Sequence, residues 1–507
     1  MSSPHNVLRF SKRSWSSSDS APEGTAHHHP GLDWVMRVTE VNRISARAGE
    51  ALLVGAADQE SLGNLLIPQV LTRLLNFSRF RCSGLVSADY SERAGYNTRN
   101  FGESILEMAE TRNLHLLHCS GDTLSTDLIE GYLSSARNEE LERFESLADI
   151  SETEELLKYV RRRTGQFDNF AHLVAPEGEF FGSRLSFHSV AIPDPDSFSA
   201  GRKKRMIEIM KSANCVGVRD RVGAEFLEAE GIEVSRMPCC LSVLPQVGAR
   251  QLGESRDSEA LNRIRHRFPN GWIAVDISGI RNEHFSPLVS ALREVTESKD
   301  LGLVFFESSP QRSDTRRSKL RRWVESFEEW RATGFDSNHI WEVASFLLHS
   351  RAYCGGSLAA RIICMSGGIA RINTPSGEGG VQSYCDLWEG DSLRAELSEN
   401  TKSWEKEITE AMDVDLSDLQ EHANWLHNVY FEKLEEFCQK TGLTPSLKPG
   451  RSETDHARSA GTFHHLQDEW LADKTSTRLF RKINRRIKTR GAHPAVKEAG
   501  RDVRSVQ

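Results

Sequence analysis

The stretch CVGVRDRVGAEFLEAEGIEV, Cys215 to Val234, contains the repeating unit of an α/β fold. A short apolar strand leads through an Arg-Asp pair into an amphipathic helix, which ends at a glycine before a second apolar strand. Asp220 is suited to cap this helix, because its carboxylate can accept hydrogen bonds from the first helical turn. Capping leaves Arg219 unexplained. A guanidinium at the end of a buried strand can bind a carboxylate or phosphate through two hydrogen bonds, and a structural ion pair, for example with Asp220, is the alternative.

The composition is that of a soluble, multidomain protein. A length of 507 residues suggests two or three domains, and 38% hydrophobic with 27% charged residues fits globular domains with polar tails. There is no run of about 18 apolar residues and no apolar segment of a secretory signal near the N-terminus, so we expect a cytoplasmic protein. The net charge of -8 argues against a protein that coats nucleic acid.

The nine cysteines predict neither a zinc site nor a disulfide framework. Their number is odd, they are scattered along the chain, and no C-x-x-C pair occurs among them. We therefore expect no bound metal, and we expect the adjacent Cys239 and Cys240 to pack as small hydrophobic residues in a reducing compartment.

The first half of the chain alternates between strand-like and helix-like segments. Residues 1–32 are Ser-rich and are expected to be disordered. From 33 to 248, apolar runs lead into loops and amphipathic helices, which predicts a parallel sheet covered on both faces, that is, a Rossmann-like domain. The passages that carry this pattern are ALLVGAADQESLGNLLIPQVLTRLL, RCSGLVSADY, LHLLHCSGDTLS, DNFAHLVAPEG and SRLSFHSVAIPDP.

A second alternating series occupies residues 255–395, after a polar, loop-like passage, LPQVGARQLGESRDSEA, near residue 250. The sequence thus predicts two Rossmann-like domains that face each other across a cleft. Ligands of such sheets bind beyond the carboxyl ends of the strands. We expect Gly121, Arg219 and Ser357 to lie at such strand ends.

The C-terminal part differs in character. Residues 400–445 are acidic and have a helical period, and residues 446–507 form a polar linker and a basic tail. The basic residues between Arg478 and Arg490 recur at helical spacing. One interpretation is a solvated helix, and the other is a patch that contacts phospholipid or acidic glycan at the inner face of a membrane.

The first glycine-containing loop, Gly55 to Asn64, joins a buried strand to a helix. Free N–H groups at such a helix start favour phosphate or carboxylate. The loop matches neither G-x-G-x-x-G nor the Walker pattern. Asn64 either belongs to an anion site here or caps the helix.

Four passages together resemble the polysaccharide pyruvyl transferases, in the order found in that family and over about residues 50 to 390. The resemblance implies two Rossmann-like halves of the glycosyltransferase-B type. It also implies transfer of a pyruvyl group from phosphoenolpyruvate, a substrate and not a cofactor, to a sugar of a cell-surface or exopolysaccharide glycan. The passages are SLGNLLIPQVLTRLL, LLHCSGDTLS, VGVRDRVGAEFLEAEGIEV and RAYCGGSLAARIICMSGGIARI.

The resemblance also assigns the donor site. An anionic donor requires cationic partners, and transfer requires a general acid. Arg219 corresponds to the family's donor-binding arginine. The implied donor site comprises Asn64, Gly63, Gly121, Arg219, Ser357 and Arg361.

The sequence departs from the family at the positions where family members carry a second donor-binding arginine and the general acid. The family's Arg-Leu-His reads Ser357-Leu358-Ala359 here, and neither serine nor alanine can replace those roles. The family's Asn-x-Gly-Asp loop reads Asn64-Leu65-Leu66-Ile67, and Ser120 stands for the first glycine of a pair. Arg361 could restore charge, although helical spacing turns it to another face. No catalytic residue can be named, and we expect slow or absent pyruvyl transfer.

Three hypotheses about function remain. The first is a pyruvyl transferase-like protein with a glycan or lipid-linked sugar as acceptor, favoured by the VRD segment. The second is a glycosyltransferase-B-type transferase with a nucleotide-sugar donor, and the third is a non-catalytic protein that binds a glycan or a protein partner. Fold alone does not determine function, and the missing acid counts against the first hypothesis more than against the other two. The first still ranks highest, because the VRD segment is the most specific of the four passages.

Overall fold

The computed structural model describes residues 49–446 with short gaps, and everything below refers to this part of the chain. The chain divides into two units, 1–47 and 48–507, and all described residues belong to the second. The expected disordered tail, residues 33–48 of the expected first domain, and the basic tail from Arg478 to Arg490 lie outside the described residues. The gaps fall at 109–113, 120, 122–123, 149–152, 181, 310–312, 329 and 376–378.

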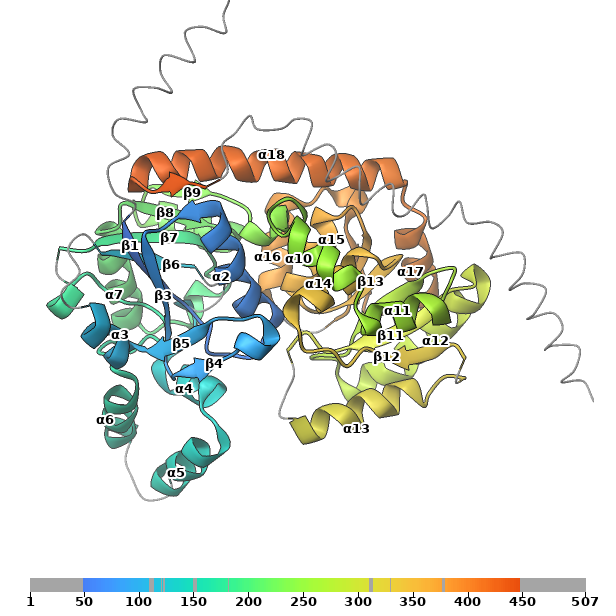
Figure 1. Ribbon diagram of the computed structural model, residues 1–507, viewed down its shortest axis with the longest axis horizontal. Helices are drawn as coiled ribbons and strands as arrows, with labels where there is room; N and C mark the ends of the chain where they lie inside the picture. The colour runs from blue at the N-terminus through green and yellow to red at the C-terminus, as the bar shows by residue number, and fades with distance from the viewer. Residues whose placement is uncertain are drawn as a thin grey trace, which may run out of the picture. The chain divides into compact units, whose positions relative to one another are not determined.

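The first half is built on an eight-stranded sheet with the order β4-β5-β3-β1-β6-β7-β8-β9 (Figure 1). All neighbouring strands are parallel except β4 and β5. Two neighbouring parallel strands must be joined by a segment that crosses from one end of the sheet to the other, and helices supply these crossovers. The strands are β1 (Glu50–Val54), β3 (Arg79–Gly84), β4 (Ala88–Asp89), β5 (Asn97–Asn100), β6 (His115–His118), β7 (Arg184–Val190), β8 (Cys215–Val218) and β9 (Val234–Arg236).

Both faces of this sheet are buried. In β1, Ala51 and Leu53 belong to one hydrophobic cluster, whereas Leu52 and Val54 belong to another. Successive side chains of a strand point to opposite faces, so two clusters mean two covered faces. The helices of this half are α2 (Leu62–Leu74), α3 (Phe101–Met108), α4 (Leu128–Ser135), α5 (Asn138–Ala148), α6 (Thr153–Thr164), α7 (Ala200–Lys211) and α8 (Arg221–Ala229).

The second half has a six-stranded parallel sheet with the order β12-β11-β10-β13-β14-β15. Its strands are β10 (Trp272–Asp276), β11 (Gly302–Phe306), β12 (Ala332–Gly334), β13 (Ala352–Gly355), β14 (Ala370–Asn373) and β15 (Ala395–Glu396). Its helices are α12 (Asn282–Lys299), α13 (Ser313–Val324), α14 (Ile340–Leu348), α15 (Leu358–Ser366), α16 (Gly379–Trp388) and α17 (Trp404–Met412).

A long helix, α18 (Leu416–Thr441), connects the second half back to the first (Figure 1). It ends at Gly442, whose φ of 72° is the left-handed conformation that glycine adopts without strain. The chain then forms β16 (Thr444–Pro445), which pairs antiparallel with β2 (Leu75–Asn76). The expected architecture of two Rossmann-like domains with a C-terminal helical extension is confirmed.

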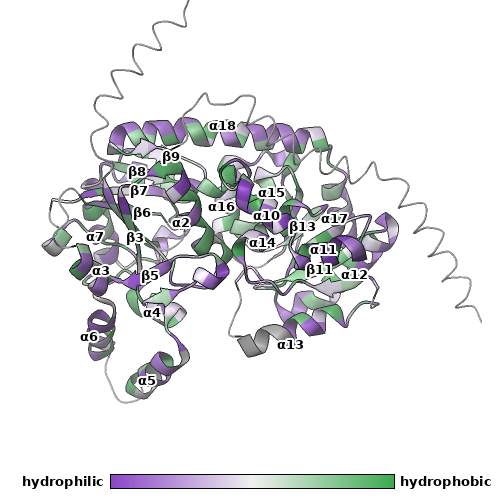
Figure 2. Ribbon diagram, viewed as in Figure 1, coloured by the Kyte–Doolittle hydropathy of each residue, from purple (hydrophilic) through white to green (hydrophobic). Residues whose placement is uncertain are grey.

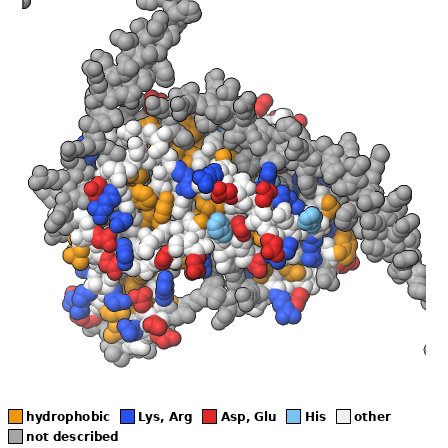
Figure 3. Space-filling view, in the orientation of Figure 1, with side chains coloured by type: hydrophobic (Ala, Val, Ile, Leu, Met, Phe, Trp, Pro, Cys, Tyr) orange, Lys and Arg blue, Asp and Glu red, His pale blue; other side chains and the backbone are white. Residues whose placement is uncertain are grey.

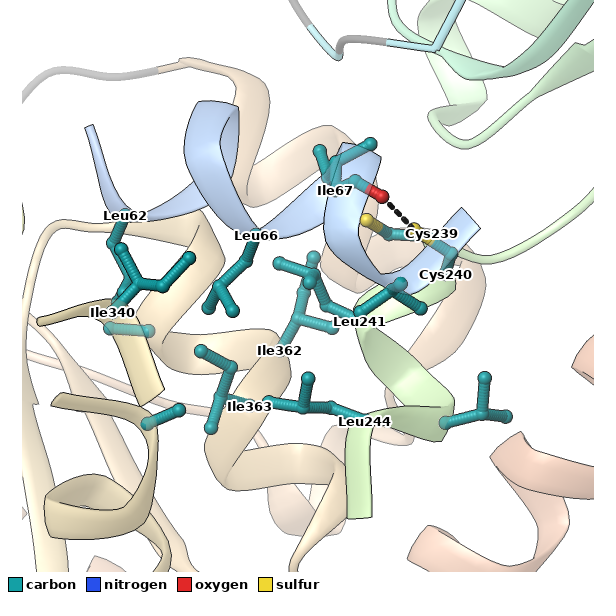
Figure 4. Close-up of a cluster of buried hydrophobic side chains, with 14 of the residues drawn as sticks. Leu62, Leu66, Ile67, Cys239, Cys240, Leu241, Leu244, Ile340, Ile362 and Ile363 are labelled. Atoms are coloured by element: carbon teal, nitrogen blue, oxygen red, sulfur yellow. Dashed lines mark hydrogen bonds between the residues drawn. The ribbon is translucent and has the colours of Figure 1, made fainter. Parts of the chain in front are cut away.

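One hydrophobic cluster runs through both halves (Figure 4). It joins α2 and the short helices after Cys239 to helices of the second half. A shared core opposes free movement of one half against the other, because separation would expose apolar surface. Labelled members in Figure 4 are Leu62, Leu66, Ile67, Cys239, Cys240, Leu241, Leu244, Ile340, Ile362 and Ile363. The packing of Cys239 and Cys240 as small hydrophobic residues is confirmed.

The passage between the halves is helical, so the prediction of a loop near residue 250 is wrong. Residues 240–267 form a 3₁₀ turn, η5 (Cys240–Val243), followed by α9 (Leu244–Val247), α10 (Ala249–Arg256) and α11 (Glu259–Arg267). Leu252 of α10 is 1% exposed, and its carbonyl accepts a hydrogen bond from Ser345 Oγ of α14 (3.3 Å). Packing against α14 stabilises a helix whose polar composition suggested a loop.

A second expectation also fails. The passage DNFAHLVAPEG contains no strand: its apolar residues belong to a loop, 165–175, in which strand-like pairing is limited to an isolated bridge between Phe170 and Asp127. The side chains from Phe170 to Ala175 are nevertheless buried. The apolar run therefore indicated that this segment is buried, but it did not indicate a strand.

The surface of the described part carries charged, neutral polar and hydrophobic side chains. α6 is coloured mostly hydrophilic in Figure 2, and charges of both signs are interspersed on the face drawn in Figure 3. Ion pairs join neighbouring elements of the first half: Arg163 of α6 pairs with Glu140 of α5, and Arg205 of α7 pairs with Asp168 of a loop. Within the described residues, no helix is both long and apolar enough to span a membrane.

Candidate functional site

A pocket of about 330 Å³ lies where the strand ends of the two sheets meet. Pockets that hold small molecules span roughly 300–1,000 Å³, so this one lies at the lower end of that range. Both halves contribute. The first half supplies Gln59, Ser61, Leu62, Gly63, Asn64, Ile67, Gly121, Thr126, His172, Arg219 and Leu241, and the second supplies Ser278, Ser308, Ser309, Gly356, Ser357, Leu358, Ala359 and Ile362.

Arg219 is the one charged residue among the described residues that line this pocket. It directly follows β8, and its backbone is held on both sides. Its N–H donates to the Val190 carbonyl (2.9 Å), and its carbonyl accepts from Trp388 Nε1 of the second half (2.7 Å). The side chain is 7% exposed, so its charge acts in a largely dehydrated setting.

Gly121 makes room for this guanidinium. A Cβ atom at position 121 would overlap Cζ and both terminal nitrogens of Arg219. The two residues come from different strand ends, after β6 and β8, and the structure brings them into direct contact. Glycine at 121 is therefore required for Arg219 to occupy its observed position.

Asp220 caps α8, as the sequence predicted. Its carboxylate accepts hydrogen bonds from Gly223 N (2.7 Å) and Ile192 N (3.0 Å). It also accepts from Ser383 Oγ of α16 (3.2 Å), and Val222 N donates to the same hydroxyl (3.0 Å). The two halves are thus hydrogen-bonded beside Arg219.

A pair of buried thiols lies behind Arg219. Arg219 Nη1 is 4.0 Å from Cys239 Sγ. A hydrogen bond from Cys240 lowers the pKa of the Cys239 thiol, burial opposes this, and the Arg219 charge adds to the lowering. Cys240 Sγ donates to the Ile67 carbonyl of α2, at 3.9 Å. These contacts tie the arginine to the core shared by both halves.

The first turn of α2 forms one wall of the pocket. Ser61 is the N-cap, because Asn64 N donates to Ser61 Oγ (3.2 Å), so the interpretation of Asn64 as the cap is wrong. The Asn64 side chain instead donates to Gln59 Oε1 (3.2 Å). Leu62 N donates to the Ser308 carbonyl of the second half (2.8 Å).

The first turn of α15 forms the opposite wall. Ser357 caps this helix through Ala360 N (3.4 Å), and the Tyr353 hydroxyl accepts from Ser357 N (3.0 Å). The N–H groups of Leu358 and Ala359 have no hydrogen-bond partner within the described part of the chain. The two walls touch at Gly63, where an added Cβ would lie 3.0 Å from Ala359 Cβ.

Serine hydroxyls complete the edge of the second sheet. The buried Asp276 at the end of β10 accepts from Ser308 Oγ (2.5 Å) and Ser278 N (3.0 Å). Burial raises the pKa of Asp276, and these hydrogen bonds oppose the rise. Asp276 therefore orients Ser308 and Ser278, which line the pocket, without lining it itself.

Arg361 does not belong to the pocket, which corrects the expectation drawn from the resemblance. Its side chain is fully buried and pairs with Glu389 Oε2 (2.5 Å) and Asn373 Oδ1 (2.8 Å). Arg371 binds the other oxygen of the same carboxylate (2.5 Å). Arg361 lies two residues past Ala359, about 200° around the helix, so it faces the core of the second half.

His172 lines the pocket, and the sequence did not single it out. It lies in the loop 165–175 that was expected to begin with a strand, and it is 1% exposed. The only signal was one imidazole within the apolar run FAHLVA. Among the described residues, no group of three or more His, Cys, Asp or Glu could hold a metal ion.

No protein-family model and no curated protein matches this sequence. Solved structures similar to it include a UDP complex of MnaA from S. aureus, with 12% identity, 77% of this chain and 95% of that chain covered, and a TM-score of 0.47. A UDP-forming α,α-trehalose-phosphate synthase from Burkholderia vietnamiensis has 10% identity, coverage of 79% and 99%, and a TM-score of 0.43. Sucrose-phosphate synthase from Thermosynechococcus elongatus has 15% identity, coverage of 78% and 98%, and a TM-score of 0.39. Because these identities and TM-scores are low, what the chain binds has to be argued from its own residues.

Proposed function

We propose that this protein is a glycosyltransferase-B-type transferase that uses a nucleoside-diphosphate sugar as donor. The observation that carries the proposal is the composition of the pocket. Arg219 and the first turns of α2 and α15 line it together, and no acidic side chain is among its described lining residues. Helix N-termini and a guanidinium both bind phosphate.

The proposed mechanism uses these groups to hold the leaving diphosphate. Negative charge builds up on the leaving group as the sugar–phosphate bond breaks, so preorganised donors around it lower the barrier. Arg219 supplies a charge, and the N–H groups of Leu358 and Ala359 supply two hydrogen-bond donors. The hydroxyls of Ser278 and Ser308 would bind hydroxyl groups of the donor.

A nucleotide sugar fits the second half better than phosphoenolpyruvate does. The resemblance assigns a second arginine and a general acid to positions 357 and 359, which hold serine and alanine. Arg361 is paired with Glu389 in the core and cannot stand in for them. A sugar nucleotide needs no proton on carbon, and its diphosphate can be held by N–H groups and one guanidinium.

Pyruvyl transfer is the second candidate, because the VRDRVGAEFLEAEGIEV segment resembles that family and its arginine lines the pocket. In both candidates the acceptor would be a glycan or lipid-linked sugar. The double substitution Ser357→Arg with Ala359→His separates the two. A gain in phosphate release from phosphoenolpyruvate would support the second candidate, and no gain would favour the first candidate or a binding protein.

The test is calorimetric binding of UDP, GDP, UDP-glucose, GDP-mannose and phosphoenolpyruvate to the wild-type protein and to Arg219→Ala. We expect a nucleotide to bind and Arg219→Ala to weaken it by about 10- to 150-fold, corresponding to about 1.5–3 kcal/mol for hydrogen bonds to a charged group. Arg236→Ala is the matched control, because Arg236 is an exposed arginine of the same half paired with Glu228 (2.8 Å).

The proposal would be overturned if no nucleotide bound, or if Arg219→Ala bound it with wild-type affinity and only lowered the melting temperature. Binding without turnover on any acceptor would favour the third hypothesis, a binding protein.

A further inference from the structure

His172 reaches the pocket from a loop whose backbone is held in place on both sides. Val174 N donates to His118 Nε2 (3.0 Å), and Ala171 N donates to the Thr126 carbonyl (3.2 Å). The imidazole lines the pocket at 1% exposure. Its position is therefore defined by a buried, hydrogen-bonded segment, as expected of a functional side chain that must be held in one geometry.

Both ring nitrogens of His172 lack a hydrogen-bond partner among the described residues. Other buried histidines of this half have one: His115 Nε2 lies 3.0 Å from Ser186 Oγ, and His188 Nε2 lies 3.0 Å from Tyr430 Oη. A buried polar group without a partner costs about 1–3 kcal/mol, so each such group calls for an explanation. A ligand in the pocket would supply the partner.

Asp58 is a second buried polar residue with an unsatisfied atom. Its Oδ2 accepts from Leu85 N (2.7 Å) and Val86 N (3.0 Å), whereas no described residue bonds Oδ1. Burial lowers the pKa of His172, and the charge of Asp58 opposes the lowering without cancelling it. His172 is therefore neutral near pH 7, with a lone pair that can take a proton.

We propose that His172 is the catalytic base that contacts the acceptor hydroxyl group. The proposal rests on the proposed function, because it requires a donor that leaves as a phosphate. The acceptor O–H bond breaks and its proton moves to a ring nitrogen of His172. The acceptor oxygen bonds to the anomeric carbon as the bond from that carbon to the phosphate oxygen breaks. The electron pair of that bond leaves on the nucleoside diphosphate.

This role also separates the two candidate donors. Both reactions deprotonate an acceptor hydroxyl group, but pyruvyl transfer also needs an acid that protonates the methylene carbon of the donor, and a neutral imidazole is not that acid. A buried, neutral imidazole is suited to the first task. His172 lies on the first half and the free N–H groups of α15 on the second, so acceptor and leaving group would be handled from opposite walls.

The test compares His172→Leu with His188→Leu. Both replace a buried histidine of the first half by an apolar residue, but only His188 has a protein partner. The measurements are binding of UDP-glucose and GDP-mannose, release of nucleoside diphosphate from them with monosaccharide acceptors or water, and the melting temperature. We expect His172→Leu to bind the donor within about threefold of wild type and to release diphosphate about 10²–10⁴-fold more slowly, the usual contribution of a positioned base.

The melting temperature distinguishes catalysis from structure. His172→Leu should melt at the wild-type temperature or above, because it removes an unsatisfied polar group, and His188→Leu should melt lower. Release by His172→Leu at the wild-type rate, loss of donor binding in it, or a fall in melting temperature like that of His188→Leu would each overturn the assignment. A wild-type protein that binds no nucleotide sugar, or that binds one without releasing diphosphate, would overturn the proposed function, whereas diphosphate release that His172→Leu leaves unchanged would overturn the catalytic role of His172 alone.

Discussion

Arg219 and Arg361 both lie near the junction of a buried parallel strand and the helix that follows it, yet they end in opposite environments. Arg219 precedes α8 and lines the pocket, with its guanidinium against Gly121. Arg361 is the fourth residue of α15, fully buried, and paired with Glu389. The position of such an arginine relative to the start of the helix therefore decides whether its side chain faces the pocket or the core.

The difference extends to the two halves as wholes. The second half keeps Arg361 and Arg371 in its core and offers the pocket only N–H groups, serine hydroxyls and apolar side chains. The first half offers a cation and an imidazole. The halves therefore have different chemical tasks in one pocket, and the charge at the site depends on the first half. The following predictions test this division.

The largest expected effect is that of Glu389→Gln. This change leaves Arg361 and Arg371 buried without their shared carboxylate, and breaking a buried pair costs about 3–5 kcal/mol. Denaturant unfolding measures the loss. Glu254→Gln is the control, because its pair with Arg250 is exposed and should contribute less than about 0.5 kcal/mol. Equal stability of the two variants would show that the ion pairs of the second half are not structural.

The loss of stability at acidic pH should depend on the same carboxylate, that of Glu389. Burial alone would raise the pKa of Glu389, but the charges of Arg371 and Arg361 outweigh it and lower the pKa to about 2. A carboxylate with a lowered folded-state pKa stabilises the protein above its unfolded value, near 4.5, and loses this contribution as the pH falls toward 2. We expect on the order of 3 kcal/mol to be lost over this range. Unfolding curves of Glu389→Gln should lack this part of the pH dependence, and an unchanged slope would contradict the assignment.

Gly121→Ala should weaken nucleotide binding by about 10-fold, close to the lower end expected for Arg219→Ala. The added methyl group displaces the guanidinium, which can move because it is the end of a flexible side chain, so the melting temperature should change little. Gly201→Ala on α7 is the matched control, since nothing lies within 4 Å of a Cβ there. Calorimetry with UDP would decide, and unaltered affinity would mean that the observed position of Arg219 does not matter for the ligand.

The smallest expected effect concerns the two helix starts. Ser61→Ala removes the cap of α2 and should lower the unfolding free energy by about 1 kcal/mol. Ser357→Ala should cost less, because its hydrogen bond to Ala360 N is longer, 3.4 Å against 3.2 Å. Thermal unfolding of both variants measures the difference. A larger loss for Ser357→Ala would show that the second helix start is the more dependent on its cap.

Much of the fold could be predicted from local patterns. The apolar runs of β1, β6, β8, β10, β11 and β13 and the helices after them are all present. The Asp220 cap was predicted because capping is a local interaction. The helices in residues 244–256 and the loop 165–175 were not, since packing against distant elements, and not local propensity, stabilises both.

Part of the candidate site was also predictable. Asn64, Gly63, Gly121, Arg219 and Ser357 all lie around one pocket because parallel strands end at a common edge, and the alternation of strands and helices is enough to predict that edge. His172 could not be found, because its loop reaches the pocket only through contacts with His118 and Thr126. Arg361 was assigned to the donor site through the resemblance, although helical spacing already turned it to another face. Only the structure shows that it pairs with Glu389 in the core.

The sequence by itself determined the class of fold, the strand ends that surround the pocket, and the arginine that lines it, because these follow from periodicity and from chain order. Only the tertiary structure decided which polar groups face the pocket and which neutralise each other in the core. Partners far apart in the chain, such as Gly121 with Arg219 and Glu389 with Arg361, meet through packing that no local pattern encodes. The chemistry of the site depends on those pairings, since a buried charge or imidazole acts on whatever the fold places opposite it.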